Sequence, residues 1–134
     1  APYNAAIRPI CLPPRGLDYT GHRAVATGWG RTDNRGNWAH ILQEVTLPIW
    51  RTESCNARHV YEILSNQELC AGPLEGGRDT CDGDSGGPLI LQIRGRWSIV
   101  GIVSWGPTQC GTRGLPGVYT RVDAFMDWII ATVR

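Results

Sequence analysis

The segment Gly83-Asp84-Ser85-Gly86-Gly87-Pro88 is the most informative part of this chain of 134 residues. A serine among glycines on a tight turn combines an exposed hydroxyl with accessible backbone N–H groups, because glycine adopts the positive φ angles that such turns need. That combination suits attack on a carbonyl carbon, with the N–H groups binding the oxyanion that forms. The segment predicts a nucleophile at Ser85. Taken alone, the glycines would also fit a surface turn without a chemical role.

A serine hydroxyl is a poor nucleophile until a base takes its proton, and that base is usually a histidine oriented by a carboxylate. The chain has three histidines, His22, His40 and His59. They lie in contexts typical of a strand, a loop and a short helix, and we expect each to be a surface residue or a satisfied core residue. The sequence therefore predicts a nucleophile without its base.

The segments on either side of Ser85 carry a family resemblance that extends over nearly the whole chain. Six blocks resemble the trypsin-like serine proteases and stand in that family's order: Arg8-Pro9-Ile10-Cys11-Leu12-Pro13, Gly28-Trp29-Gly30, Leu69-Cys70-Ala71-Gly72, residues 79–89, Ile102-Val103-Ser104-Trp105-Gly106 and residues 116–122. Two further stretches, Leu47-Pro48-Ile49-Trp50 and residues 113–117, are most similar to arthropod clip-domain and clotting-cascade proteases.

The resemblance implies only half of that family's catalytic domain. In the family, the catalytic histidine and aspartate lie in Ala-His-Cys and Asp-Ile-Ala-Leu contexts upstream of the Arg-Pro-Ile-Cys-Leu-Pro block, and activation creates an Ile-Val-Gly-Gly start. None of these is present here. We therefore expect residues 1–134 to be the C-terminal part of a trypsin-like peptidase domain, with the N-terminal barrel absent.

The composition favours an all-β protein, with 17 Gly, 9 Pro and short apolar runs. The resemblance specifies the C-terminal antiparallel β-barrel of the double-barrel fold, followed by a C-terminal α-helix. Apolar runs bounded by turn residues predict strands over residues 22–31, 42–50, 89–93, 97–105 and 117–122. Helices are expected over residues 52–60 and 123–133, with Thr52 and Asp123 as capping residues.

Five cysteines indicate a secreted protein. Four cysteines alone would allow three connectivities. The resemblance implies Cys55 with Cys70 and Cys81 with Cys110. Cys11 is left over, and its position in the family commonly pairs with a cysteine of the propeptide or light chain, so we expect an interchain disulfide there. A buried free thiol is the alternative.

The resemblance also assigns roles around the nucleophile. Ser85 would attack the peptide carbonyl, and the backbone N–H groups of Gly83 and Ser85 would form the oxyanion hole. Asp84 would pair with the N-terminal ammonium that activation frees. Because an unpaired buried charge costs about 3 to 5 kcal/mol, we expect the turn to be poorly ordered without that partner.

Substrate selection is assigned to the residues near this turn. Asp79 corresponds to the acid at the base of the primary pocket, where a carboxylate selects a guanidinium or ammonium group. Gly106 and Gly117 match pocket-wall positions that leave room for a long basic side chain. The Thr80 hydroxyl would reach a lysine ammonium. Together these residues predict cleavage after Arg or Lys.

The remaining subsite residues would contact the substrate backbone and its leaving-group side. Ser104, Trp105 and Gly106 would pair with the substrate as a short antiparallel strand. Asp82 would disfavour acidic residues beyond the cleaved bond.

The charge balance excludes several partners. A formal net charge of +1, without a long run of one sign, argues against nucleic acid and anionic membranes. No apolar run approaches the roughly 18 residues of a membrane span. No cluster has metal-ligand spacing, so neither a metal nor another cofactor is expected.

Two functions remain for this sequence. The first is a secreted, zymogen-derived serine endopeptidase that takes its histidine and aspartate from an upstream segment. Its partners would be protein substrates and protease inhibitors, and it would act in a proteolytic cascade such as hemolymph clotting. The second is a catalytically silent fragment or noncatalytic binding module that retains the pocket. The intact Ser85 favours the first for the parent protein, and we expect the isolated chain to be inactive.

Overall fold

The computed structural model describes residues 1–63 and 66–133. The strands are β1 (Arg23–Gly28), β2 (Gln43–Pro48), β3 (Glu68–Ala71), β4 (Pro88–Ile93), β5 (Arg96–Trp105) and β6 (Gly117–Arg121). A short helix α1 (Thr52–Asn56) precedes β3, and a 3-10 turn (Val122–Phe125) leads into helix α2 (Met126–Thr132). The protein is all-β apart from these short helices, as the composition predicts.

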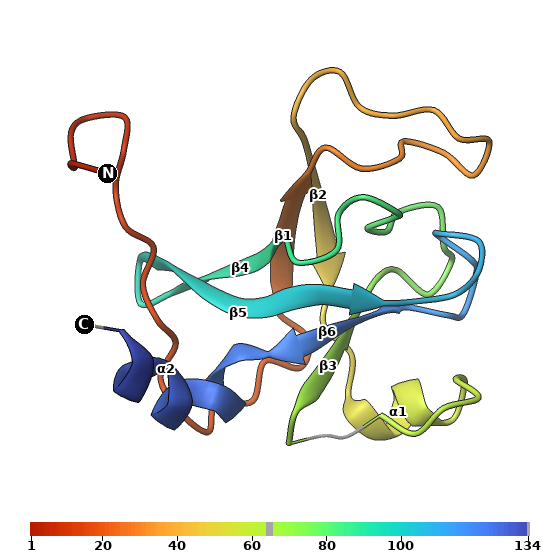
Figure 1. Ribbon diagram of the computed structural model, residues 1–134. Helices are drawn as coiled ribbons and strands as arrows, with labels where there is room; N and C mark the ends of the chain where they lie inside the picture. Colours follow the sequence, from red (N-terminus) through yellow and green to blue (C-terminus); the bar gives the residue numbers. More distant parts are fainter. Residues whose placement is uncertain (64–65, 134) are drawn as a thin grey trace.

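All six strands form one antiparallel sheet in the order β2-β1-β4-β5-β6-β3. The sheet curls strongly, so that β1 and β2 run steeply across β4 and β5 (Figure 1). Its two edge strands meet where Ile49, just after β2, pairs with Ala71 at the end of β3. Curling and this contact between the edges give the predicted trypsin-like barrel architecture.

The core follows from the alternation of side chains along the strands. Its largest cluster lies inside the curled sheet and includes Leu47, Leu89, Val100 and Tyr119, all with essentially no exposed surface. A second cluster joins α1 to the barrel through Cys55, Ile63, Cys70 and Val118. The two clusters hold the strand ends that carry the site residues.

The β4–β5 connection is a two-residue hairpin. Ile93 pairs with Arg96, and the intervening Arg94 and Gly95 have φ angles of 51° and 77°. Positive φ at both central residues matches the right-handed twist of the flanking strands. Arg94 is the sole non-glycine residue with positive φ in the described part of the chain.

Both helix predictions were too long, and both capping residues were wrong. Helix α1 ends at Asn56, and its N-cap is Arg51 rather than Thr52. Helix α2 begins at Met126, because residues 122–125 form a 3-10 turn. Asp123 binds the N-terminal segment instead, accepting a hydrogen bond of 3.2 Å from the Gly16 N–H.

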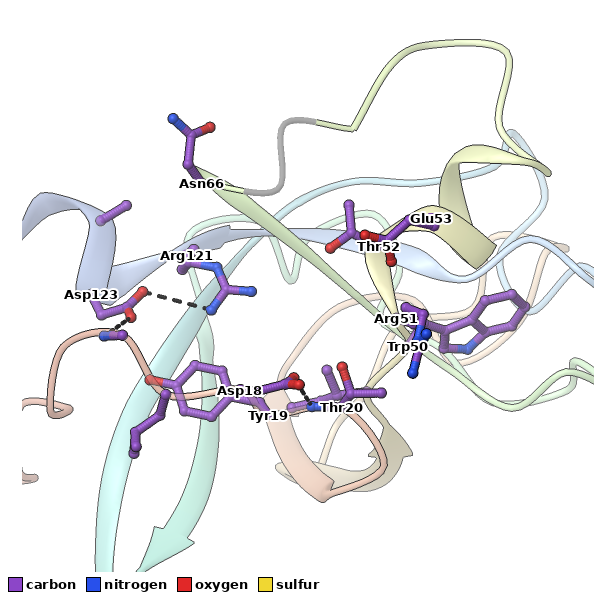
Figure 2. Close-up of a pocket in the computed structure, with 14 residues that line it drawn as sticks. Asp18, Tyr19, Thr20, Trp50, Arg51, Thr52, Glu53, Asn66, Arg121 and Asp123 are labelled. Atoms are coloured by element: carbon purple, nitrogen blue, oxygen red, sulfur yellow. Dashed lines mark hydrogen bonds and ion pairs between the residues drawn. The ribbon is translucent and has the colours of Figure 1, made fainter.

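Asp123 belongs to a polar cavity of about 530 Å³ beside the end of β6 (Figure 2). Its carboxylate lies 3.8 Å from the Arg121 guanidinium, and both side chains are largely buried. Burial, reinforced by Asp123, raises the pKa of the neighbouring Tyr19 to about 12. Among the described residues that line this cavity there is no serine, cysteine or histidine, so it lacks a nucleophile of the predicted kind.

Candidate active site

A separate cavity of about 470 Å³ brings together most of the predicted site residues. It lies between the end of β5, the nucleophile turn and the Cys81–Cys110 disulfide. The predicted residues on its lining are Asp79, Thr80, Asp82, Ser85, Ser104, Trp105 and Gly106. Residues from two chain segments more than ten positions apart thus meet in one concave site, the arrangement that small-ligand and substrate pockets usually have.

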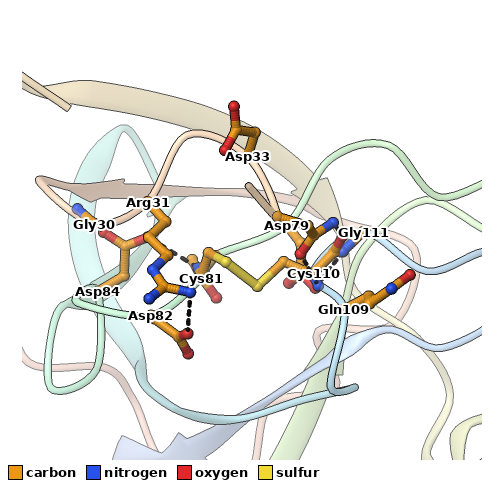
Figure 3. Close-up of a disulfide and its surroundings, with 12 residues drawn as sticks. Gly30, Arg31, Asp33, Asp79, Cys81, Asp82, Asp84, Gln109, Cys110 and Gly111 are labelled. Atoms are coloured by element: carbon orange, nitrogen blue, oxygen red, sulfur yellow. Dashed lines mark hydrogen bonds and ion pairs between the residues drawn. A yellow bond between two sulfur atoms is a disulfide. The ribbon is translucent and has the colours of Figure 1, made fainter. Parts of the chain in front are cut away.

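Asp79 places a carboxylate at one end of this cavity. Its Oδ2 accepts a hydrogen bond of 3.0 Å from the Gly111 N–H (Figure 3). Its Oδ1 is buried and has no hydrogen-bond partner among the described residues. Burial raises the pKa of Asp79, while the backbone N–H groups of Gly111 and Thr80 act in the opposite direction. A buried carboxylate oxygen without a donor is a site that a cationic ligand can satisfy.

Two glycines keep the approach to Asp79 open. A Cβ atom on Gly117 would lie 2.8 Å from the Asp79 Oδ1, too close for an ordinary contact. A Cβ atom on Gly106 would lie 3.6 Å from the Gly117 Cα, so the two glycines face each other. Gly117 therefore leaves space beside the carboxylate, and the role of both glycines as pocket-wall residues stays a prediction.

Thr80 has a partner inside the barrel, and its contact with a lysine ammonium stays a prediction. Its hydroxyl lies 3.0 Å from the phenolic oxygen of Tyr119, a side chain that is fully buried in the barrel. Burial raises the pKa of Tyr119 well above its usual range, so the phenol remains protonated. The hydroxyl pair fixes Thr80 beside Asp79.

The end of β5 carries Ser104 and Trp105 along the cavity. The β5–β6 register shifts between Val103 and Trp105, a bulge that leaves Ser104 exposed. The Trp105 indole N–H donates to Glu68 Oε2 at 3.0 Å. These contacts fix the strand end, and the pairing of Ser104, Trp105 and Gly106 with a substrate stays a prediction.

His59 and Tyr61 surround Trp105, a role that the sequence did not indicate. The His59 ring lies 5.2 Å from the Trp105 ring, and the Tyr61 ring lies 6.0 Å from it, both edge-on. The His59 Nε2 lies 2.8 Å from the Pro116 carbonyl oxygen. His59 is thus satisfied, as expected, but it also supports the chain beside Gly117. No motif marks this contact, because it depends on the path of residues 57–63.

The nucleophile turn has the predicted exposure and backbone geometry. Ser85 is exposed, and Gly83 has φ of 91°. The Asp84 N–H donates to the Cys81 carbonyl and the Gly87 N–H to the Asp84 carbonyl, both at 2.9 Å. No hydrogen bond from the N–H of Gly83 or Ser85 is found within the described ranges 1–63 and 66–133. Both donors of the predicted oxyanion hole are therefore available.

Asp84 points away from this hole into a cradle of backbone N–H groups. Its Oδ1 accepts from Gly30 at 2.8 Å and its Oδ2 from Cys81 at 3.0 Å. A Cβ atom on Gly28 or Gly30 would strike the carboxylate, which explains the glycines of the Gly28-Trp29-Gly30 block. Two N–H donors hold the turn in this chain without an ammonium partner. The pairing of Asp84 with an N-terminal ammonium stays a prediction.

Asp82 is less free than the sequence suggested. Its carboxylate lies 3.3 Å from the Arg31 guanidinium, in an exposed ion pair (Figure 3). Exposed pairs of this kind contribute little to stability. The pair does offset the negative charge that was expected to repel acidic residues on the leaving-group side.

Both predicted disulfides are present. Cys55 bonds to Cys70, and Cys81 bonds to Cys110. The second bridge ties the nucleophile turn to the loop that carries Gly111, the donor to Asp79. Cys11 is a free, partly exposed thiol beside β5. Its interchain disulfide remains a prediction.

The base for Ser85 is not in this cavity. No histidine occurs among the described residues that line it, and His22 and His40 are exposed elsewhere. Residues 1–63 and 66–133 contain no group of three or more His, Cys, Asp or Glu side chains that could hold a metal ion.

No helix in the described part of the chain is long and apolar enough to cross a bilayer. The site thus combines a serine, two N–H donors and a buried carboxylate.

Comparison with known proteins places this combination in a family. Residues 1–129 match the trypsin family, and the chain belongs to it. It is 45% identical to the proclotting enzyme of Tachypleus tridentatus over an alignment of 132 residues, which covers 95% of this chain and 35% of that protein.

Other relatives are of similar closeness. The chain is 43% identical to trypsin-1 of Astacus astacus over 129 residues, covering 96% of this chain and 54% of that protein. It is 42% identical over 135 residues to CLIP domain-containing serine protease B15 of Anopheles gambiae, covering 95% of this chain and 36% of the relative. The chain therefore spans about a third to a half of the length of these relatives.

Proposed function

We propose that this chain is the nucleophile-bearing and substrate-recognising half of a secreted serine endopeptidase that cleaves after Arg or Lys. The observation that carries the proposal is the unpaired Oδ1 of Asp79, buried in the same cavity that the exposed Ser85 lines. A guanidinium or ammonium group bound to Asp79 would satisfy this oxygen. It would also bring the backbone carbonyl of the same Arg or Lys residue toward Ser85.

The proposed reaction is acyl transfer. The Ser85 Oγ attacks the carbonyl carbon while a histidine of another segment takes the hydroxyl proton, and the N–H groups of Gly83 and Ser85 bind the oxyanion. The C–N bond then breaks, and the histidine returns the proton to the leaving amine. Water hydrolyses the resulting ester and restores Ser85. Loss of one oxyanion donor typically costs about 3 to 4 kcal/mol in the transition state.

The proposal requires an upstream segment that carries the histidine and the aspartate, with residues 1–134 as the C-terminal part of the peptidase domain. Support comes from the relatives, of which this chain spans 35% to 54%. Support also comes from an apolar hollow of about 460 Å³ lined by Ile102, Phe125 and Trp128, the last 67% exposed. Exposed apolar surface of this kind usually marks an interface. Cys11 would supply a covalent link to the same segment.

Secretion and activation belong to the same proposal. Two disulfides and a family that includes a proclotting enzyme favour an extracellular zymogen in a proteolytic cascade, with protein substrates and protease inhibitors as partners. Asp84 would receive the N-terminal ammonium that activation frees, next to the N–H groups that already hold it.

The second candidate is a noncatalytic module that binds cations but does not cleave. It is favoured by the absence of a histidine from the described cavity lining. It applies to this chain in isolation, whereas the first applies to the assembled protease.

Replacement of the nucleophile tests the first candidate. In the protease assembled with its upstream segment, Ser85→Ala should lower kcat for an Arg p-nitroanilide by about 10⁴-fold or more. Benzamidine, which needs only Asp79 and the pocket, should bind as before. Ser54→Ala, at an exposed serine of α1, is the matched control. Turnover retained in Ser85→Ala would contradict the assignment.

A further inference from the structure

We propose that Trp38 is a positioning residue for the nucleophile turn, and that its indole ring holds Gly83 where the Gly83 N–H can bind the oxyanion. The catalytic meaning of this role rests on the proposed function, but the packing does not. Neither the motifs around Ser85 nor the pocket residues involve Trp38.

The contact between Trp38 and Gly83 is direct. A Cβ atom built on Gly83 would clash with Cζ3 of the Trp38 ring, and would lie 3.2 Å from Cη2 of that ring and 3.1 Å from the Gly30 Cα. The Gly83 backbone is therefore enclosed by the indole and by Gly30. A side chain at Gly83 would displace the ring, and loss of the ring would leave the glycine unsupported on that side.

A small hairpin sets the position of Trp38. Arg31 and Trp38 form an isolated antiparallel bridge. The Ala39 N–H donates to the Gly30 carbonyl at 3.1 Å, and the Thr32 N–H donates to the Asn37 carbonyl at 2.9 Å. Trp38 thus stands on the same two-stranded unit that places the Gly30 N–H on Asp84.

Arg31 joins the indole to the residue before Gly83. Its guanidinium carbon lies 5.5 Å from the centre of the Trp38 ring. Its guanidinium also lies 3.3 Å from the Asp82 carboxylate, and the backbone N–H of Arg31 donates to the Asp82 carbonyl at 2.8 Å. A cation stacked on an aromatic face and paired with a carboxylate is held in one orientation. The contacts therefore form a connected unit over the start of the turn.

The hairpin is anchored a second time at the disulfide. The Asn34 side chain accepts from the Cys110 N–H at 2.8 Å and donates to the Cys110 carbonyl at 3.0 Å. The tip of the hairpin is thereby tied to the partner of Cys81. Because both ends of the hairpin are fixed, Trp38 can transmit support to Gly83.

The exposure of Trp38 indicates that this support is its main structural contribution. The side chain is 49% exposed and is not part of either core cluster. An oxyanion donor acts only within about 2.7–3.1 Å of the developing charge, so small shifts of Gly83 weaken it. Asp84 holds one side of the turn through Gly30 and Cys81, and Trp38 holds the other.

Amide hydrogen exchange in the protease assembled with its upstream segment tests the packing without requiring activity. The Asp84 and Gly87 amides, both bonded within the turn, report its opening. Trp38→Ala should speed their exchange by about tenfold, while Trp38→Phe, which keeps a flat ring, should stay within about threefold of wild type. Trp97→Ala removes a comparably exposed indole from β5 and should leave both amides unchanged.

Unchanged exchange in Trp38→Ala would overturn the inference, and so would faster exchange spread over the whole barrel. Should Trp38→Ala fail to fold, Trp38→Leu keeps an apolar side chain without the ring and is expected to give the same local effect. A failure of the proposed function would appear instead as turnover that survives Ser85→Ala, with the exchange result intact.

Inhibition of the assembled protease tests the catalytic role. Benzamidine binds in the pocket alone. 4-Amidinophenylboronic acid also forms a covalent bond with the Ser85 Oγ, and its charged adduct accepts hydrogen bonds from the oxyanion donors. Trp38→Ala should raise the inhibition constant of the boronate by about tenfold, lower kcat similarly and leave benzamidine and KM unchanged, since only the charged adduct needs Gly83. Trp38→Phe should return the inhibition constant of the boronate to near its wild-type value. Equal changes for both inhibitors would overturn the positioning role.

Discussion

The surroundings of Asp79 and the nucleophile turn lie on either side of Cys81 in the chain. They differ in how much of their proposed chemistry this chain supplies. At the pocket end, one barrel provides the charge of Asp79 and the space left by Gly106 and Gly117. At the turn, the barrel provides Ser85 and two N–H donors, but no histidine lines the described cavity. In the proposed function, recognition of a cation is therefore local to this chain, whereas turnover would require groups from another segment.

The largest expected effect separates these two regions at Asp79. Asp79→Asn keeps the shape of the side chain but removes its charge, so a bound guanidinium loses its partner at a cost of about 3 to 5 kcal/mol, or about 10²- to 4 × 10³-fold in affinity. Benzamidine affinity, measured by calorimetry, should fall by that factor. Asp82→Asn, which changes an exposed acid at the turn, should change it little. Equal losses in the two variants would break the distinction.

The disulfide that joins the two regions should affect both stability and recognition. Replacing Cys81 and Cys110 by serine should lower the free energy of unfolding by about 3 to 4 kcal/mol, because the bridge closes a loop of 29 residues. Since Gly111 donates to Asp79, benzamidine affinity should also fall. The matched removal of Cys55–Cys70 should cost about 3 kcal/mol, since its loop spans 15 residues, and leave affinity unchanged. Denaturant titration and calorimetry measure the two quantities. Unaltered benzamidine affinity in the variant without Cys81–Cys110 would show that this disulfide contributes to stability alone.

Two alanine substitutions sharpen the description of the pocket. Gly117→Ala should weaken benzamidine by about tenfold, because the new methyl would press on the Asp79 carboxylate and displace it. Gly106→Ala should have a smaller effect, since its methyl would lie 3.6 Å from Gly117, an ordinary contact distance. The reverse order would show that the narrow point of the pocket lies at Gly106.

The smallest expected effect is a shift in pH dependence. Burial raises the pKa of Asp79 in the free chain, so the carboxylate takes up a proton at a higher pH than an exposed aspartate does. Cation affinity should accordingly fall as the pH drops through this raised pKa. The buried charge also lowers the free energy of unfolding. This loss is absent below the ordinary pKa of an aspartate and complete above the raised pKa of Asp79, so protonation of Asp79 should stabilise the fold. In Asp79→Asn the corresponding part of the pH dependence should vanish. A loss of affinity confined to the ordinary aspartate range would contradict the effect of burial.

The sequence predicted which residues converge on one cavity better than it predicted the connections around them. Asp79, Ser85 and Gly106 lie in dense motifs, so their convergence on one cavity followed from the family's order of blocks. The strand β3 (Glu68–Ala71) was missed as an element, because four residues give too short a pattern of alternation.

Asp123 and Trp38 show why the rest could not be predicted. Asp123 precedes a helical pattern as a capping residue does, but the carboxylate binds Gly16, which is 107 residues away in the chain. Trp38 stands among loop residues without periodicity, and only the folded hairpin brings it to Gly83. Both contacts depend on tertiary packing, which local sequence patterns do not contain.

Calorimetric titration of this chain alone with benzamidine tests the central claim most directly. If recognition is complete within one barrel, the chain should bind one equivalent, and Asp79→Asn should abolish the binding. A folded chain that binds no benzamidine would contradict the claim, because Asp79 and its surroundings would then require the upstream segment as much as Ser85 does.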